Sequence, residues 1–214
     1  MKIFISCLFF AFSLVACSQP KSAGDIIKLG SPKGASSNEA VADFAEGCFW
    51  HAEIVFQSLN GVRDAVSGYA GGTDGHPSYE KVASGGTGHA ETVQVYYDPT
   101  KISYETLVAA FFASQDPTTL NRQGNDEGTE YRSIAFYRND AEKQVIEKTI
   151  KQLTDAKKYS NKIVTQVVPF SKFYPAEDYH QEYIYHNPGN GYVRNVSIPD
   201  FMEFKKEFKG SFKN

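Results

Sequence analysis

The residues best suited to chemistry in this sequence stand in one short stretch, EGCFWH, at positions 46–51. Cys48 follows Gly47 and directly precedes Phe49 and Trp50. A thiol at the start of a helix faces unpaired N–H groups and the positive end of the helix dipole, which lower its pKa and make it a nucleophile. The alternative is that Cys48 and its aromatic neighbours are core residues, because free cysteine is among the most buried residue types. From this stretch alone the two interpretations carry equal weight.

Glu91 favours the reactive interpretation. The alternation in the strand predicted over residues 89–99 places Glu91 on the same face as Val93 and Val95. Burial raises the pKa of a carboxyl group, so Glu91 can stay neutral and donate a proton. The alternative is that a bulge or fraying at the strand end turns Glu91 to solvent. An activated thiol and a neutral acid together outline a catalytic site.

The segment 115–133 is long for a connection and shows no periodicity. Loops of this length are usually functional or disordered. Its hydrogen-bonding side chains include those of Asp116, Asn121, Arg122, Gln123, Asn125, Asp126, Tyr131 and Arg132. This density exceeds what a connector needs, although by itself it is a weak signal.

Periodicity predicts the elements that must position these residues. Apolar residues at helical spacing follow Cys48, which places it in the first turn of a helix that comes directly after a strand. The predicted strands are residues 40–45, 62–72, 89–99, 133–137 and 162–170, and the predicted helices are residues 48–59, 103–114, 141–153 and 199–208. This alternation favours a single α/β domain over residues 41–214, an α+β two-layer sandwich with a ferredoxin-like core and a mixed sheet.

The N-terminus has the features of an export signal. Residues 1–16 predict a lipoprotein signal peptide whose apolar core is too short to span a membrane. The sequence LVAC at 14–17 resembles the bacterial lipoprotein box, so we expect cleavage before Cys17 and lipid attachment to it; the alternative is an ordinary signal. Residues 17–40 would be the lipidated cysteine and a flexible linker. We expect an exported protein, lipid-anchored on the periplasmic side of the cell envelope, with Ser18 favouring the outer membrane.

Cysteine and charge counts limit the remaining classes. Of three cysteines, Cys7 would leave with the signal and Cys17 would carry lipid, so Cys48 has no partner for an internal disulfide. A formal net charge of −3 gives no basic stripe for nucleic acid. The five histidines have no spacing typical of a metal site. We therefore expect a small or peptidic substrate, no nucleic acid, no metal, and a monomer.

Together these segments resemble the peptide methionine sulfoxide reductase A family, in a single-catalytic-cysteine, lipoprotein form. The motifs that carry the resemblance occur in family order and span nearly all of residues 41–190. They are GCFW at 47–50, GYAGG at 68–72, SYEKV at 78–82, TGHAETVQVYYDP at 87–99, QDPTTLNRQGNDEGTEYRS at 115–133 and FYPAEDYHQEY at 173–183.

The resemblance implies reduction of the S epimer of methionine sulfoxide, free or in proteins, as a repair of oxidative damage. It implies that Cys48 attacks the sulfoxide sulfur and that Glu91 protonates the oxygen, which leaves Cys48 as a sulfenic acid. It further implies that Phe49 and Trp50 bind the methyl group, that Tyr79 and Tyr131 hold the oxygen, and that Asp126 positions the substrate. No cofactor is implied beyond an external thiol reductant such as thioredoxin or a small thiol.

Two departures from the family pattern bear on mechanism. Many relatives carry a recycling cysteine in a GYC stretch, whereas this chain reads Gly191-Tyr192-Val193. We therefore expect no recycling of Cys48 through an internal disulfide, and direct reduction of Cys48 by an external thiol. His51 stands where many relatives have glycine. A pair of Cys48 and His51 could act as a thiol hydrolase, so this activity is the alternative, although we expect the His51 ring to lie on the surface.

A third class is an inert lipoprotein that only binds oxidised peptides. The presence of Cys48 together with Glu91 argues against it, because binding alone needs neither.

Overall fold

The fold is built on one mixed sheet. The computed structural model describes residues 38–213, so the predicted signal peptide, Cys17 and most of the predicted linker lie outside the described residues. Six strands form the sheet in the order β7-β6-β1-β3-β2-β8. Their bounds are β1 Ala40–Glu46, β2 Val62–Ala70, β3 Ala90–Tyr97, β6 Ser133–Tyr137, β7 Gln166–Pro169 and β8 Phe173–Pro175. Strands β6 and β7 pair in parallel, and the other neighbours pair antiparallel.

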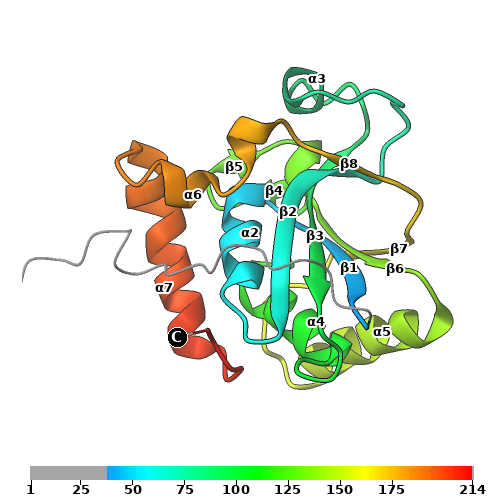
Figure 1. Cartoon of the computed structure of the whole chain (residues 1–214). Coiled ribbons are helices and arrows are strands. Elements are labelled where there is room, and N and C mark those ends of the chain that lie inside the picture. Colours follow the sequence, from blue (N-terminus) through cyan, green and yellow to red (C-terminus); the bar gives the residue numbers. More distant parts are fainter. Residues whose placement is uncertain (1–37, 214) are drawn as a thin grey trace, which may run out of the picture.

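The central strands and two helices form the ferredoxin-like core that the sequence predicts. Helix α2 (Phe49–Gln57) connects β1 to β2, and α4 (Tyr104–Ala113) lies between β3 and β6. With the order β6-β1-β3-β2, this is the β-α-β-β-α-β arrangement. Helix α5 (Asp140–Asp155) lies between β6 and β7, and α7 (Ile198–Glu207) packs beside α2 (Figure 1).

The helices enclose the main core against one face of the sheet. Phe44 on β1 stacks on Phe56 of α2 and on Phe111 of α4, with ring centroids 5.1 and 5.2 Å apart. Such aromatic pairs contribute about 0.5–1.5 kcal/mol each beyond their buried area. Successive side chains of a strand point to opposite faces, so buried Val93 shares its face with Glu91. The same face that holds the core therefore carries a carboxyl group.

Several short elements were not predicted, because a few residues show no period. Segment 115–133 contains the hairpin of β4 (Arg122–Gln123) and β5 (Asp126–Glu127) and the turn η1 (Thr129–Tyr131). The others are α3 Tyr79–Ala83, β8 Phe173–Pro175, η2 Asp178–His180, α6 Tyr183–His186 and the π-helical turn η3 Val193–Ser197. The strand predicted over 162–170 is wrong at its start, because Val164 N–H donates to the Pro117 carbonyl in a loop instead of joining the sheet.

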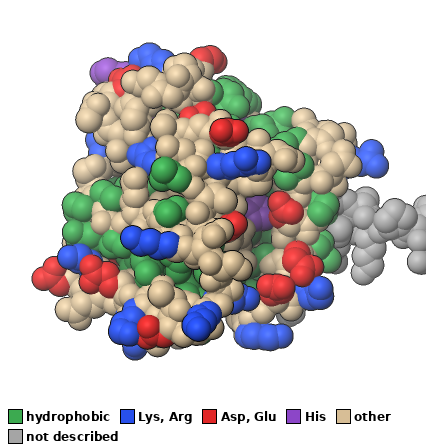
Figure 2. Space-filling model, turned by 180° about the vertical axis from the view of Figure 1, so that it is seen from behind, with side chains coloured by type: hydrophobic (Ala, Val, Ile, Leu, Met, Phe, Trp, Pro, Cys, Tyr) green, Lys and Arg blue, Asp and Glu red, His purple; other side chains and the backbone are tan. Residues whose placement is uncertain are grey.

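Charges of both signs are interspersed on the face shown in Figure 2, without a continuous stripe of either sign. That face therefore offers no basic surface for nucleic acid. Within residues 38–213, no helix combines the length and the apolar character needed to cross a bilayer.

Candidate active site

The junction of β1 and α2 positions Cys48. Gly47 has φ +96°, a conformation that side-chain-bearing residues rarely adopt, and a Cβ there would lie 2.6 Å from Cβ of Gln123. Cys48 is the N-cap residue of α2. The predicted placement of Cys48 at a strand-to-helix corner is therefore confirmed.

Glu91 faces the same helix start. Its Oε2 accepts a hydrogen bond from the Phe49 backbone N–H at 2.9 Å. The side chain is buried, and burial raises the pKa of Glu91 to about 8, although the bond from Phe49 lowers it. The prediction that Glu91 points inward with a raised pKa is confirmed, and the carboxyl group is mostly neutral at pH 7.

The predicted low pKa of Cys48 is wrong. Burial raises the pKa of this thiol well above its usual range, and the neighbouring Glu91 carboxylate raises it further. Backbone N–H groups of His51 and Trp50 do lower it, as expected at a helix N-terminus, but by less. Cys48 is 9% exposed. The thiol is therefore protonated in the free protein at neutral pH.

One cavity of about 280 Å³ brings together all the side chains predicted for catalysis and substrate binding. They are Cys48, Phe49 and Trp50 at the start of α2, Tyr79 of α3, Glu91 of β3, Asp126 of β5 and Tyr131 of η1. Asn190 and Tyr192 also line this cavity and were not predicted. No local pattern could have found them, because they lie far along the chain from Cys48. We call this space the sulfur cavity.

Aromatic rings form one wall of the sulfur cavity. Phe49 is buried and stacks on Tyr79, with ring centroids 6.5 Å apart. Trp50 stacks face to face on Tyr183 at 3.7 Å, and its Nε1–H donates to Nδ1 of His180 at 3.1 Å. The indole is thus held on one face and at its polar edge.

Hydroxyl and carboxyl groups line the other walls of the sulfur cavity. Burial, followed by the charge of Glu91, raises the pKa of Tyr79 to about 12 and that of Tyr131 further. Both phenols therefore keep their protons and can donate hydrogen bonds. The Tyr192 hydroxyl donates to Asp126 Oδ2, which links the β4–β5 hairpin to the C-terminal region. A small apolar group beside a polar acceptor atom fits this combination of walls.

His51 does not lie on the surface as predicted. It is half-buried, and its Nε2 makes a 3.3 Å hydrogen bond with the Ser114 carbonyl oxygen. Burial lowers the pKa of His51, so the ring is neutral at pH 7. The ring is engaged with α4's C-terminal end rather than with Cys48, which does not favour a cysteine–histidine hydrolase. No group of three or more His, Cys, Asp or Glu side chains within residues 38–213 is arranged to hold a metal ion.

Comparisons with known proteins agree with this geometry. A family model described as Peptide methionine sulfoxide reductase matches residues 40–212. The curated Peptide methionine sulfoxide reductase MsrA of Pasteurella multocida is 48% identical over 172 residues, covering 80% of this chain and 98% of that protein.

Solved structures agree as well. The crystal structure of Mxr1 from Saccharomyces cerevisiae in reduced form superposes with a TM-score of 0.68 at 38% identity, covering 74% of this chain and 91% of that one. Mxr1 in complex with Trx2 gives a TM-score of 0.50 at 29% identity, covering 72% of this chain and 90% of that one.

Proposed function

This chain belongs to the peptide methionine sulfoxide reductase family, and from that membership we propose the role of each residue in the sulfur cavity. The activity is reduction of methionine sulfoxide to methionine. The observation that carries the assignment of roles is the convergence of a buried thiol, a neutral carboxyl group and an aromatic wall in one cavity of about 280 Å³. Cys48 is the nucleophile, and Glu91 is the acid.

The first half of the reaction needs no net proton. The Cys48 sulfur attacks the sulfoxide sulfur while Glu91 gives its proton to the oxygen, which makes the substrate sulfur electrophilic. The oxygen passes to Cys48, methionine leaves, and the thiol proton restores Glu91. Because Glu91 and Cys48 are both protonated at rest, the site holds no buried charge pair before substrate arrives.

The other lining residues orient the sulfoxide. Phe49 and Trp50 receive the methyl group, and the hydroxyl groups of Tyr79 and Tyr131 donate to the oxygen. Asp126, held by the Tyr192 hydroxyl, binds the substrate backbone. Fixed positions for methyl and oxygen accept one sulfur configuration, the S epimer.

An external thiol completes the cycle. Cys48 is the free cysteine of the described residues, and the sequence has no cysteine after it. A thiol therefore has to attack the sulfenic acid and form a mixed disulfide, which a second thiol resolves. A thioredoxin-like protein or a small thiol is the reductant, and the structure of Mxr1 in complex with Trx2 supports the first of these.

The test uses the full-length protein with each epimer of N-acetyl-methionine sulfoxide amide and excess dithiothreitol. We expect the S epimer alone to be converted, and a Cys48→Ser variant to be inactive. Turnover of both epimers at equal rates would refute the orienting role of the aromatic wall. Turnover by Cys48→Ser would refute the nucleophile.

We propose further that the mature protein begins at a lipidated Cys17 and is anchored on the periplasmic side of the envelope. The support is the sequence LVAC at 14–17 after a short apolar stretch. Labelling of producing cells with an alkyne fatty acid tests this. We expect label on the wild-type chain and none on Cys17→Ser, whereas an unlabelled wild-type chain in the soluble fraction would contradict the anchor.

A further inference from the structure

A second cavity also reaches Cys48. Its volume is about 260 Å³, and it shares Cys48, Asp126 and Tyr192 with the sulfur cavity. The residues that set it apart include Glu46, His51, Gln123, Ser197, Asp200 and Glu203. We call this space the acidic cavity. Cys48 therefore borders two differently lined spaces, one aromatic and one acidic.

Carboxyl groups dominate the lining of the acidic cavity. They belong to Glu46, Asp116, Asp126, Asp200, Glu203 and Glu207, and no lysine or arginine of the described chain lines it. Burial raises the pKa of Glu46 well above its usual value, so this group is neutral. Lys206 pairs with Glu203 at 3.2 Å and offsets part of one charge. The remaining carboxylates give a negative potential, which concentrates cations and repels anions.

Three buried polar atoms of this lining have no hydrogen-bond partner among residues 38–213, namely Oε1 of Glu46, Nδ1 of His51 and Oγ of Ser197. Glu46 and Ser197 are each 1% exposed. Ser114 Oγ donates to Oε2 of Glu46 at 2.9 Å, but neither Oε1 of Glu46 nor Oγ of Ser197 has a hydrogen-bond partner among residues 38–213. Buried polar groups in folded proteins almost always have partners. The acidic cavity is therefore lined by groups that a polar molecule would complete.

We propose that the acidic cavity admits the thiol that reduces Cys48 and that it prefers a small thiol carrying a protonated amine. This inference rests on the proposed function. Displacement at a divalent sulfur runs along the line of the bond that breaks. If the hydroxyl of the sulfenic acid lies beside Glu91 in the sulfur cavity, the incoming sulfur has to approach from the opposite side. The acidic cavity is a second space that Cys48 lines.

An amine fits the free groups of the acidic cavity. An ammonium group has three donors and no acceptor, so it can donate to Oε1 of Glu46 and to Oγ of Ser197. Asp200 and Glu203 then offset its charge. A carboxylate-bearing thiol meets repulsion from the same side chains and finds no lysine or arginine in this lining.

The redox balance of the step is complete with two thiols. The first thiol sulfur bonds to the Cys48 sulfur as the S–O bond breaks, and the thiol proton leaves with the hydroxyl as water. A second thiol attacks the sulfur of the first, which releases a free disulfide and returns Cys48 as a thiol. Two thiols are oxidised, and one sulfenic acid is reduced.

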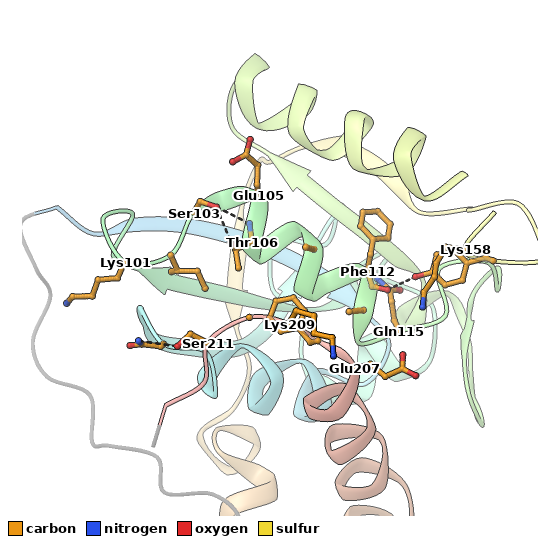
Figure 3. Close-up of a pocket in the computed structure, with 17 residues that line it drawn as sticks. Lys101, Ser103, Glu105, Thr106, Phe112, Gln115, Lys158, Glu207, Lys209 and Ser211 are labelled. Carbon is orange, nitrogen blue, oxygen red and sulfur yellow. Dashed lines mark hydrogen bonds between the residues drawn. The ribbon is translucent and has the colours of Figure 1, made fainter. Parts of the chain in front are cut away.

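A larger groove adjoins the acidic cavity. Its volume is about 930 Å³, and it shares Ala113, Gln115 and Glu207 with the acidic cavity. Figure 3 shows Gln115 and Glu207 together at one end of this groove, between α4 and the C-terminal segment. Lys158 and Lys209 also line the groove, so the charge preference originates in the acidic cavity next to Cys48 and not along the groove.

The experiment separates the two half-reactions. Full-length protein is first treated with one equivalent of S-sulfoxide without thiol, and the methionine released measures the proposed function alone. Cysteamine, 2-mercaptoethanol or 3-mercaptopropionate is then added, and loss of the sulfenic acid is followed by rapid quench and mass spectrometry. Rates are expressed per thiolate, because the three thiols ionise to different extents. We expect cysteamine to exceed 3-mercaptopropionate about tenfold, as electrostatic steering allows.

Variants locate the preference. The double variant Asp200→Asn/Glu203→Gln should reduce the cysteamine-to-mercaptopropionate ratio about fivefold, and 1 M salt should reduce it in the wild type. The matched control Glu147→Gln/Asp155→Asn removes the same charge from α5, outside the cavity lining, and should leave the ratio unchanged.

Equal rates for the three thiols in the wild type, or an equal ratio in the double variant and the wild type, would overturn the proposal. Absence of the methionine burst would instead overturn the proposed function.

Discussion

The exchange of Glu91 for glutamine tests the acid in the mechanism with little change of structure. The glutamine side-chain oxygen can accept the Phe49 N–H bond that Glu91 Oε2 accepts at 2.9 Å, but the amide cannot give up a proton. Positioned general acids contribute about 10²–10⁴-fold to rate. We therefore expect Glu91→Gln to release methionine at least about 100-fold more slowly in a single turnover.

The pH dependence gives a second, independent signature. The pKa of Glu91 is raised to about 8, so its neutral form is present below that pH and lost above it. About nine-tenths of the carboxyl groups are neutral at pH 7 and about one-tenth at pH 9, which predicts a roughly tenfold fall in the wild-type rate. The rate of Glu91→Gln should stay flat over this range.

The assay is single-turnover methionine formation without thiol, by rapid quench between pH 6 and pH 10. Glu80→Gln serves as the control, because Glu80 is exposed on α3. A wild-type rate that rises through pH 8 would mean that ionisation of Cys48 governs the reaction and that the neutral form of Glu91 does not. A Glu91→Gln rate within threefold of the wild type would remove Glu91 from catalysis altogether.

Three further predictions concern stability and binding. Gly47→Ala should destabilise the fold by about 1–3 kcal/mol in thermal unfolding, because φ is +96° and the new Cβ would meet Gln123 at 2.6 Å; unchanged stability would contradict this. Burial raises the pKa of Glu53 from 4.5 to about 7. The neutral side chain therefore stabilises the fold below pH 4.5, and the free energy of unfolding falls by about 3 kcal/mol as the pH rises through 7. Urea unfolding at pH 4.5 and pH 8 should show this fall in the wild type and not in Glu53→Gln. Tyr192→Phe removes the hydrogen bond to Asp126 and should raise KM several-fold with little change in methionine release at saturation; an unchanged KM would exclude the bond from substrate binding.

Most of the sheet could be predicted because its elements are long enough to show a period. Glu91 is an example: its alternation with Val93 predicts that its side chain lies on the buried face of the sheet, and the structure confirms this position. Short elements escaped prediction. The β4–β5 hairpin has two residues in each strand, and such a segment has no period to detect. Asp126, on β5, was therefore predicted from family resemblance and not from pattern.

The sequence by itself determined the chemistry at residue 48: a thiol after Gly47 at a helix start, an inward carboxyl group at residue 91, and a valine at position 193 where many relatives carry a recycling cysteine. These features are local, and they depend on residue type and spacing. Only the tertiary structure decided the protonation state of that thiol. Burial by distant segments outweighs the helix N–H groups that sequence neighbours supply, since removing water from a charge costs more than two backbone hydrogen bonds return.

Tertiary structure also decided what surrounds the sulfur. The indole of Trp50 is held by His180 and Tyr183 from a segment far along the chain. The acidic cavity likewise combines residues of β1, α2, segment 115–133 and α7. Spacing along a sequence describes the neighbours within one helix or strand. The shape and charge of a space between elements depend on which of their faces meet, and only packing determines that.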